Sequence, residues 1–150
     1  MRYLYGEEVE YEYNLIQPED VTKLQAFSCD NKRLDYYIHN ELIQENVVDT
    51  EDGLPFKVID LKTDDIITVF SLAASGIIWK MDNYTHVLPA IKIDIFATDV
   101  NYQKMHIDSA SKESVNPDEH FYLSDSIMCD VIRHCRDISE NKATAKYIVL

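Results

Sequence analysis

Glycine and proline are scarce in this sequence, with three and four among 150 residues. Disordered and loop-rich chains are usually much richer in both, so the scarcity excludes those classes. No apolar run approaches the ~18 residues that a membrane-spanning helix needs, and the opening residues MRYLYGEE contain no signal-peptide core. We therefore expect a single soluble, cytoplasmic domain over residues 1–150, with no membrane partner.

Cysteine is also rare, and the three present form no metal-binding pattern. Cys29, Cys129 and Cys135 make an odd set without a CxxC pair. His134 lies between the last two, but these spacings do not converge on one helix face. We expect reduced thiols in a cytosolic protein and no metal site.

Positive charge is the third scarcity, with 14 basic against 27 acidic residues and a net charge of −13. Such a field repels phosphate backbones, so direct nucleic-acid binding is not expected. It favours basic partners such as polyamines, aminoglycosides or Lys/Arg-rich proteins. The simpler interpretation is a soluble acidic protein of bacterial or phage type.

The helix and strand signals follow one another in an α+β order. Alternating apolar and polar residues predict strands at residues 11–17 and 87–99. Apolar runs predict a hairpin of strands 56–61 and 66–75, joined by the short polar connection 62–65, and a last strand that starts at residues 147–150. Caps and helical spacing predict a short helix from Pro18, an amphipathic helix over residues 31–46 capped by Asp30 or Asn31, and a long helix from a capping box at residues 116–119 to about 142. The expected fold is mixed α/β, with a central, mostly antiparallel sheet flanked by helices.

Two details of the middle strands bear on function. Residues 80–86 are predicted as a loop, and Ile77, Ile78 and Trp79 either prolong or end the strand before it. Trp79 is expected in the core, with a substrate cleft or an interface as alternatives. Strand 87–99 has the clearest alternation, which predicts two faces: Ile91, Ile93, Ile95 and Ala97 on one, and Lys92, Asp94, Phe96 and Thr98 on the other.

Three local motifs resemble the GNAT superfamily of acetyl-CoA-dependent N-acetyltransferases. They are FxCDNxxLxxY at residues 27–37, IITVFSL at 66–72 and FATDxxYQ at 96–103, the most specific of the three. The first motif is similar to the opening of the branch that includes the acetyltransferase toxins of toxin–antitoxin pairs. The resemblance covers residues 11–150 and implies an acyltransferase fold.

The resemblance also implies where acetyl-CoA would bind. In the family the fourth strand separates from the fifth and the pantetheine lies in the gap, bonded here by main-chain groups of Phe96, Ala97 and Thr98. A phosphate loop follows, and in this sequence it is formed by Gln103, Lys104, Met105, His106, Ile107 and Asp108.

The phosphate loop departs from the family pattern. The family reads Gln/Arg-x-x-Gly-x-Gly/Ala, whereas His106 and Asp108 occupy the two small-residue positions. A carboxylate about 4 Å from a phosphate adds roughly 4 kcal/mol of repulsion, and a helix N-terminus returns only about 0.3–1 kcal/mol. If Asp108 points at the pyrophosphate, the repulsion is therefore the larger effect, with Lys104, His106 and Lys112 available to offset it.

The sequence stops where the family's fifth strand belongs. Typical members continue with a helix, often carrying a general-acid tyrosine, and two further strands. We expect a domain incomplete at its C-terminus: a short variant, a fragment, or a chain whose sheet a protein partner or second copy completes.

Two functions remain open from the sequence. The first is transfer of acetyl from acetyl-CoA to a primary amine on a cationic small molecule or protein, with Asp94 as candidate general base. An ordinary exposed strand carboxylate is the alternative explanation of Asp94, and Cys29 is not needed because the family transfers acetyl directly. The second function is a non-catalytic, acidic GNAT-fold interaction or inhibitor protein of phage or mobile-element type. The toxin-like opening implies aminoacyl-tRNA as acceptor, but the net charge argues against that substrate.

Overall fold

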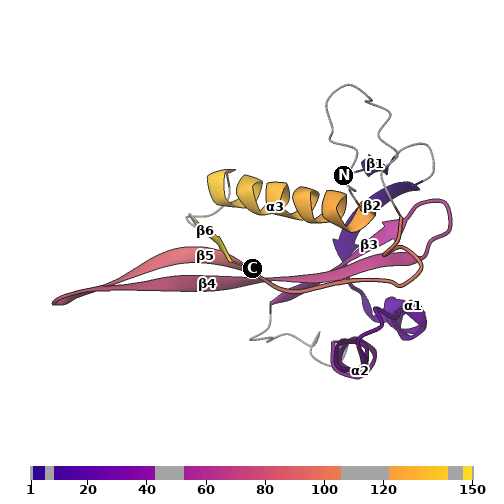
Figure 1. Ribbon diagram of the computed structural model, residues 1–150, viewed down its shortest axis with the longest axis horizontal. Helices are drawn as coiled ribbons and strands as arrows, with labels where there is room; N and C mark the ends of the chain where they lie inside the picture. Colours follow the sequence, from indigo (N-terminus) through magenta and orange to yellow (C-terminus); the bar gives the residue numbers. More distant parts are fainter. Residues whose placement is uncertain (1, 6–8, 43–52, 106–121, 142–146, 150) are drawn as a thin grey trace.

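A computed structural model of the chain has one six-stranded sheet between two layers of helices (Figure 1). The structure describes residues 2–5, 9–42, 53–105, 122–141 and 147–149. The strands lie in chain order: β1 (Arg2–Tyr5), β2 (Val9–Leu15), β3 (Leu54–Asp60), β4 (Ile66–Met81), β5 (Tyr84–Thr98) and β6 (Tyr147–Val149). The pairs from β1 to β5 are antiparallel, and β6 runs parallel to β5. The mixed α/β class and the mostly antiparallel sheet are as expected.

Helices α1 (Val21–Ala26) and α2 (Lys32–Asn40) cover one face of the sheet, and α3 (Leu123–Asn141) covers the other (Figure 1). Pro18 opens the first helical turn as predicted. The cap of α2 is also confirmed, because Asn31 Oδ1 accepts from the backbone N–H groups of Arg33 and Leu34. The helix ends at Asn40, before the predicted end, and residues 43–46 lie outside the described part of the chain.

The described start of helix α3 has a capping carboxylate. Its first residue is Leu123, and Asp125 Oδ2 accepts from the backbone N–H of Tyr122 at 2.9 Å. This carboxylate satisfies one of the free donors at the helix start. The capping box at residues 116–119 lies outside the described residues.

Each face of the sheet has its own hydrophobic core. On the α3 face, the helix presents Leu123, Ile127, Val131 and Cys135 at intervals of four residues, all at most 1% exposed. They pack on strand residues that include Phe70, Leu72, Ile91 and Ile93. On the other face, Leu24, Phe27 and Ile38 of the α1–α2 layer pack on Ile66, Val69 and Ala97. Burial on both faces explains why the first half of β4 is continuously apolar or small.

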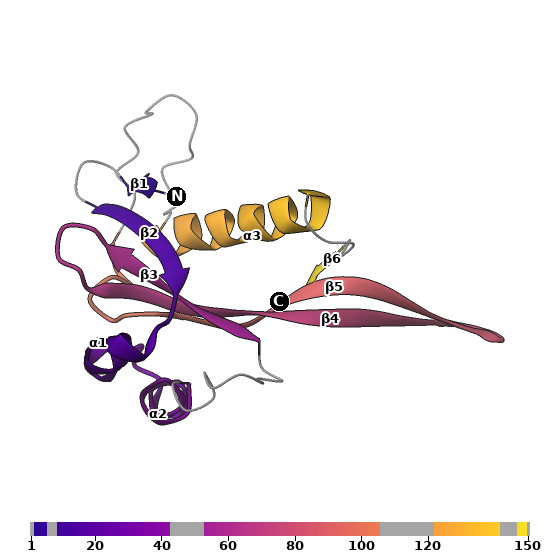
Figure 2. The ribbon, with the colours of Figure 1, turned by 180° about the vertical axis from the view of Figure 1, so that it is seen from behind.

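The prediction of a loop over residues 80–86 is wrong. Strands β4 and β5 pair without interruption to Met81 and Tyr84, which leaves Asp82 and Asn83 as a two-residue turn. Asp82 has a φ of +38°, the left-handed region that tight hairpin turns require. The result is a long two-stranded ribbon that projects beyond the sheet (Figure 2). Core burial of Trp79 is also wrong, because its side chain lies on this ribbon and is 56% exposed.

Candidate functional site

A β-bulge interrupts β5 towards its C-terminal end. Phe70 of β4 lies opposite Phe96, but Leu72 lies opposite Ile93, so Ser71 faces both Asp94 and Ile95. The backbone N–H of Ile95 donates to Ser71 Oγ at 3.2 Å. The serine hydroxyl therefore satisfies a donor that the bulge removes from the ladder.

The bulge overturns the predicted face assignment of β5. Ile91 and Ile93 both lie in the α3-side core, as one shared face predicts. Phe96, which was predicted on the opposite face, packs against that same core. Ala97 packs in the α1–α2 core instead. Since side chains alternate with a period of two residues, one inserted residue exchanges the faces for everything after it.

Beyond the bulge, β5 has an open edge. Strand β6 pairs only with Ala90, Ile91 and Lys92, and no described strand lies against residues 96–98 on that side. Asp99 N–H donates to Ile67 O of β4 at 2.8 Å, so Asp99 faces β4. Because main-chain groups alternate in direction along a strand, those of Phe96 and Thr98 lie on the open edge and those of Ala97 face β4.

The start of the predicted phosphate loop is held by Gln103. Its Nε2 donates to Thr98 O at 2.9 Å and to Cys29 O at 3.0 Å. Lys104 is exposed and Met105 half-buried, whereas His106, Ile107 and Asp108 lie outside the described residues. The threonine carbonyl on the open edge thus has a partner already, which leaves Phe96 with the accessible pair of main-chain groups.

Asp99 joins the end of β5 to the turn before α2. Its carboxylate is 6% exposed and accepts from Ser28 N, Asn101 N and Asn101 Nδ2 at 2.9–3.1 Å. Val100 N–H adds a further bond to Ser28 O at 2.8 Å. Asp99 belongs to the FATDxxYQ motif, but no role for its side chain was predicted from the sequence.

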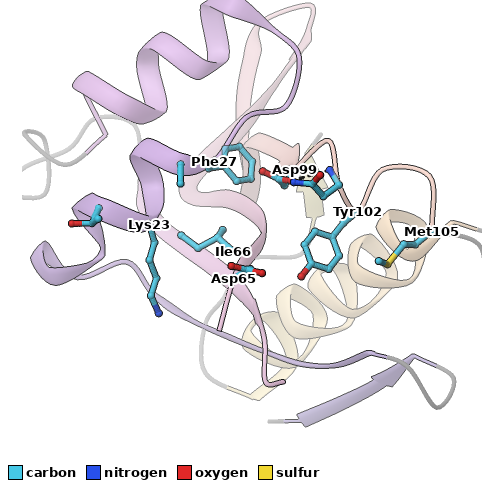
Figure 3. A pocket seen from close by; sticks show the side chains of 10 residues that line it. Lys23, Phe27, Asp65, Ile66, Asp99, Tyr102 and Met105 are labelled. Atoms are coloured by element: carbon cyan, nitrogen blue, oxygen red, sulfur yellow. Dashed lines mark hydrogen bonds between the residues drawn. The ribbon is translucent and has the colours of Figure 1, made fainter. Parts of the chain in front are cut away.

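Tyr102, the tyrosine of the same motif, lines a hollow of about 510 Å³ between α1, the β3–β4 turn and the segment after β5 (Figure 3). Its hydroxyl donates to Asp60 Oδ2 at 3.2 Å and lies 3.3 Å from Thr63 Oγ1. Burial raises the pKa of the Tyr102 phenol, and the nearby Asp60 carboxylate raises it further. The hydroxyl therefore stays protonated as a structural donor.

A second cleft, of about 650 Å³, lies between the bulged part of β5 and α2. Asp94 and Ile95 of β5 line it, together with Tyr36 and Tyr37 of α2 and Glu41 directly after that helix. This volume is in the range of small-molecule sites. Asp94 forms an ion pair with Lys92, and its side chain is 28% exposed. The bulge thus places a carboxylate and a half-buried apolar side chain in the lining of one cleft.

Cys29 is poorly suited to act as a nucleophile. Burial raises the pKa of its thiol to about 11, and the Asp35 carboxylate, to which Sγ donates at 3.2 Å, contributes to the increase. The same carboxylate accepts from Cys29 N and Ser28 Oγ, both at 2.8 Å. These bonds outweigh its desolvation and lower the pKa of Asp35, so it stays ionised beside the thiol.

We expect iodoacetamide at pH 8 to label Cys129 much faster than Cys29. Cys129 is exposed to the reagent, whereas the Cys29 thiol, with a pKa of about 11, is almost entirely protonated at that pH and so contributes little of the reactive thiolate. Peptide mass spectrometry after timed quenching gives each rate. Cys135, whose pKa burial also raises to about 11, is the slow internal reference. Equal rates at Cys29 and Cys129 would contradict the assignment.

Within the described ranges, no group of three His, Cys, Asp or Glu side chains is placed to hold a metal ion. In that same part of the chain, no helix is long and apolar enough to cross a membrane.

The fold matches solved GNAT acetyltransferases, toxin-type members among them, at low sequence identity. A bacterial toxin structure has a TM-score of 0.63 and 13% identity over 92% of this chain and 70% of its own. AtaTR bound with AcCoA has a TM-score of 0.56 and 11% identity over 86% and 67%. A GNAT family acetyltransferase from Staphylococcus aureus has a TM-score of 0.52 and 14% identity over 93% and 84%. No protein-family model and no curated protein matches the sequence.

Proposed function

We propose that this chain is an N-acetyltransferase that moves acetyl from acetyl-CoA to a primary amine. The observation that carries the proposal is the bulge at Asp94 and Ile95, beyond which β5 has an open edge beside β6. The same two bulge residues line the α2 cleft. A thioester bound along the edge and an amine bound in the cleft would meet at Asp94 and Ile95.

The open edge fits the pantetheine arm, which carries amides with both donors and acceptors. Phe96 directs its N–H and C=O groups to the side of β5 on which β6 pairs. Thr98 offers its N–H, since its carbonyl accepts from Gln103. Lys104 is exposed just beyond and supplies a cation for the phosphates. The relative whose structure holds AcCoA supports the same ligand.

The reaction that we propose is a direct transfer. The neutral amine nitrogen attacks the acetyl carbonyl carbon, a C–N bond forms, and the C–S bond breaks to release coenzyme A as a thiolate that solvent protonates. The amine proton passes to Asp94, directly or through water, as to a general base. The net charge of −13 favours a cationic acceptor, whether a small polyamine-like molecule or a basic protein. In this proposal the protein is cytoplasmic and of bacterial or phage type.

Calorimetric titration of the whole chain tests the proposal. We expect micromolar binding of acetyl-CoA, and similar binding of coenzyme A because the edge recognises the pantetheine and not the acetyl group. No heat with millimolar ligand would overturn the proposal and leave the non-catalytic interaction protein as the explanation.

A second expectation concerns the acceptor step. With an amine acceptor from a screen of polyamines and lysine peptides, Asp94→Asn should lower kcat by about 10²-fold or more and leave acetyl-CoA binding unchanged. Glu19→Gln, an equal charge change on an exposed side chain away from the cleft, is the matched control. An Asp94→Asn variant with unchanged kcat would remove Asp94 from the reaction.

A further inference from the structure

The ribbon formed by the ends of β4 and β5 carries an unusual surface. Ten large hydrophobic side chains are exposed in the described part of the chain, and half of them lie on this ribbon: Ile78, Trp79, Met81, Tyr84 and Val87, each 56–72% exposed. The ribbon projects away from both helix layers (Figures 1 and 2). By the strand register, Trp79, Met81 and Tyr84 share one face of the ribbon, and Ile78 and Val87 share the other. Exposed apolar area on both faces of a projecting element is typical of an interaction surface.

The outer edge of β4 is open along the ribbon. Strand β3 pairs with β4 only as far as Leu72, and no described strand lies against residues 73–81 on that side. Ile67 O accepts from Asp99 of β5, so odd-numbered β4 residues direct their main-chain groups to β5. The N–H and C=O groups of Ala74, Gly76 and Ile78 therefore point outward.

The two edges of the ribbon differ in how well they are protected against pairing with a further strand. Pro89 lies opposite Gly76, so its nitrogen is on the outer edge of β5, where a proline offers no N–H. The β4 edge reads AASGIIW over residues 73–79 and contains neither proline nor charge. Charged residues and prolines are the usual protection of an exposed edge strand. Over residues 73–79 the β4 edge lacks both, with Lys80 as the first charge beyond them, so this part of the edge is suited to accept another strand.

We propose that the β4 edge pairs, antiparallel and about a two-fold axis, with the β4 edge of a second copy of this chain. Charge selects this occupant. Residues 75–90 carry only Lys80 and Asp82, so the ribbon is neutral in a chain of net charge −13. Two acidic copies repel each other least where neither contributes charge, whereas a basic partner gains nothing from a neutral surface. An antiparallel pair of identical strands is self-complementary, as a two-fold interface requires.

This dimer goes beyond the proposed acetyl transfer and does not depend on it. It also differs from completion of the sheet at β6, because the paired edge is that of β4. In the joined sheet, the β5 open edge and the α2 cleft of each copy stay accessible, since they lie past the bulge and outside the ribbon.

Sedimentation equilibrium of the whole chain tests the dimer. We expect a species of twice the 17.5 kDa chain mass. Ile78→Lys places a charge on the edge, and we expect it to raise the dimer Kd by at least about tenfold. Leu15→Lys makes the same change at a side chain that is 42% exposed on β2, away from the ribbon, and should leave the Kd unchanged. A chain that stays monomeric at the highest soluble concentration, or equal effects of the two substitutions, would overturn the proposal.

Two further readouts locate the interface. Trp79 is the single tryptophan, so its emission should shift to shorter wavelength as the concentration rises through the Kd. Hydrogen exchange should show concentration-dependent protection at the amides of Gly76 and Ile78, whereas Ile77 and Trp79, which face β5, should be protected at all concentrations. A dimer without added protection at Gly76 and Ile78 would refute pairing through this edge.

Discussion

Replacing Asp99 with alanine should lower the free energy of unfolding by about 3–5 kcal/mol. The carboxylate accepts three hydrogen bonds at 6% exposure, two of them from backbone N–H groups. Hydrogen bonds to a charged acceptor are stronger than bonds between neutral groups, and alanine removes all three of these bonds at once. Thermal unfolding should show a fall in Tm of roughly 10 °C.

Asp137→Ala provides the comparison. It removes the same side chain from an exposed position of α3, where alanine is a good helix former. Its Tm should stay close to that of the unchanged chain. If Asp99→Ala unfolds at the same temperature as Asp137→Ala, the Asp99 contacts do not hold the turn before α2.

Local signals predicted most of the element order. The Asn31 cap and the Pro18 helix start were recognisable because each depends on residues within one turn. The β3–β4 hairpin was predictable for the same reason, since residues 62–65 give a short polar connection between two apolar runs. Such features need no information about distant parts of the chain.

The bulge at the candidate site was not predictable in this way. Residues 91, 93, 95 and 97 are all apolar or small, so the sequence alternates without interruption through the bulge. The inserted residue is defined only by the pairing of β5 with β4, where Ser71 faces two residues. A bulge is therefore a property of two strands, and the alternation of one strand contains no record of it.

The ribbon was missed for a different reason. The polar residues of KMDNYTH at 80–86 predicted a loop. Asp82 and Asn83 are, however, residue types that favour two-residue hairpin turns. Cross-strand pairs such as Trp79 with His86 and Met81 with Tyr84 extend the strands through that stretch. Cross-strand pairs that contain an aromatic residue stabilise a hairpin, and which residues are paired is known only once the register is known.

The FATDxxYQ motif resembles the start of a cofactor loop, but the polar side chains of Asp99, Tyr102 and Gln103 form hydrogen bonds within the protein. Asp99 fixes the turn before α2, Tyr102 bonds to Asp60 and Thr63, and Gln103 joins Cys29 to Thr98. Together they fix the end of β5 and its open edge. The motif therefore serves ligand binding through the position of the strand, in addition to any contact of its own.

Gln103→Glu gives the sharpest test of that role. The side-chain nitrogen donates to two carbonyl oxygens at 2.9 and 3.0 Å, and a carboxylate in its place has no hydrogen to donate. Three acceptors would then face one another in a half-buried site, at an expected loss of about 2–4 kcal/mol of unfolding free energy. Gln103→Ala removes the donors without adding a charge, so it should lose less, about 1–2 kcal/mol.

The dependence on pH separates repulsion from lost packing. A protonated glutamate regains one donor. The loss of unfolding free energy that Gln103→Glu causes, relative to the unchanged chain, should therefore become smaller as the pH falls toward about 4. The loss that Gln103→Ala causes should stay constant over the same range. Because the Thr98 carbonyl lies on the open edge, Gln103→Glu should also weaken acetyl-CoA binding more than Gln103→Ala does, measured by calorimetry at pH 7. A glutamate variant as stable as the alanine variant at pH 7 would show that Gln103 does not bridge these two carbonyls.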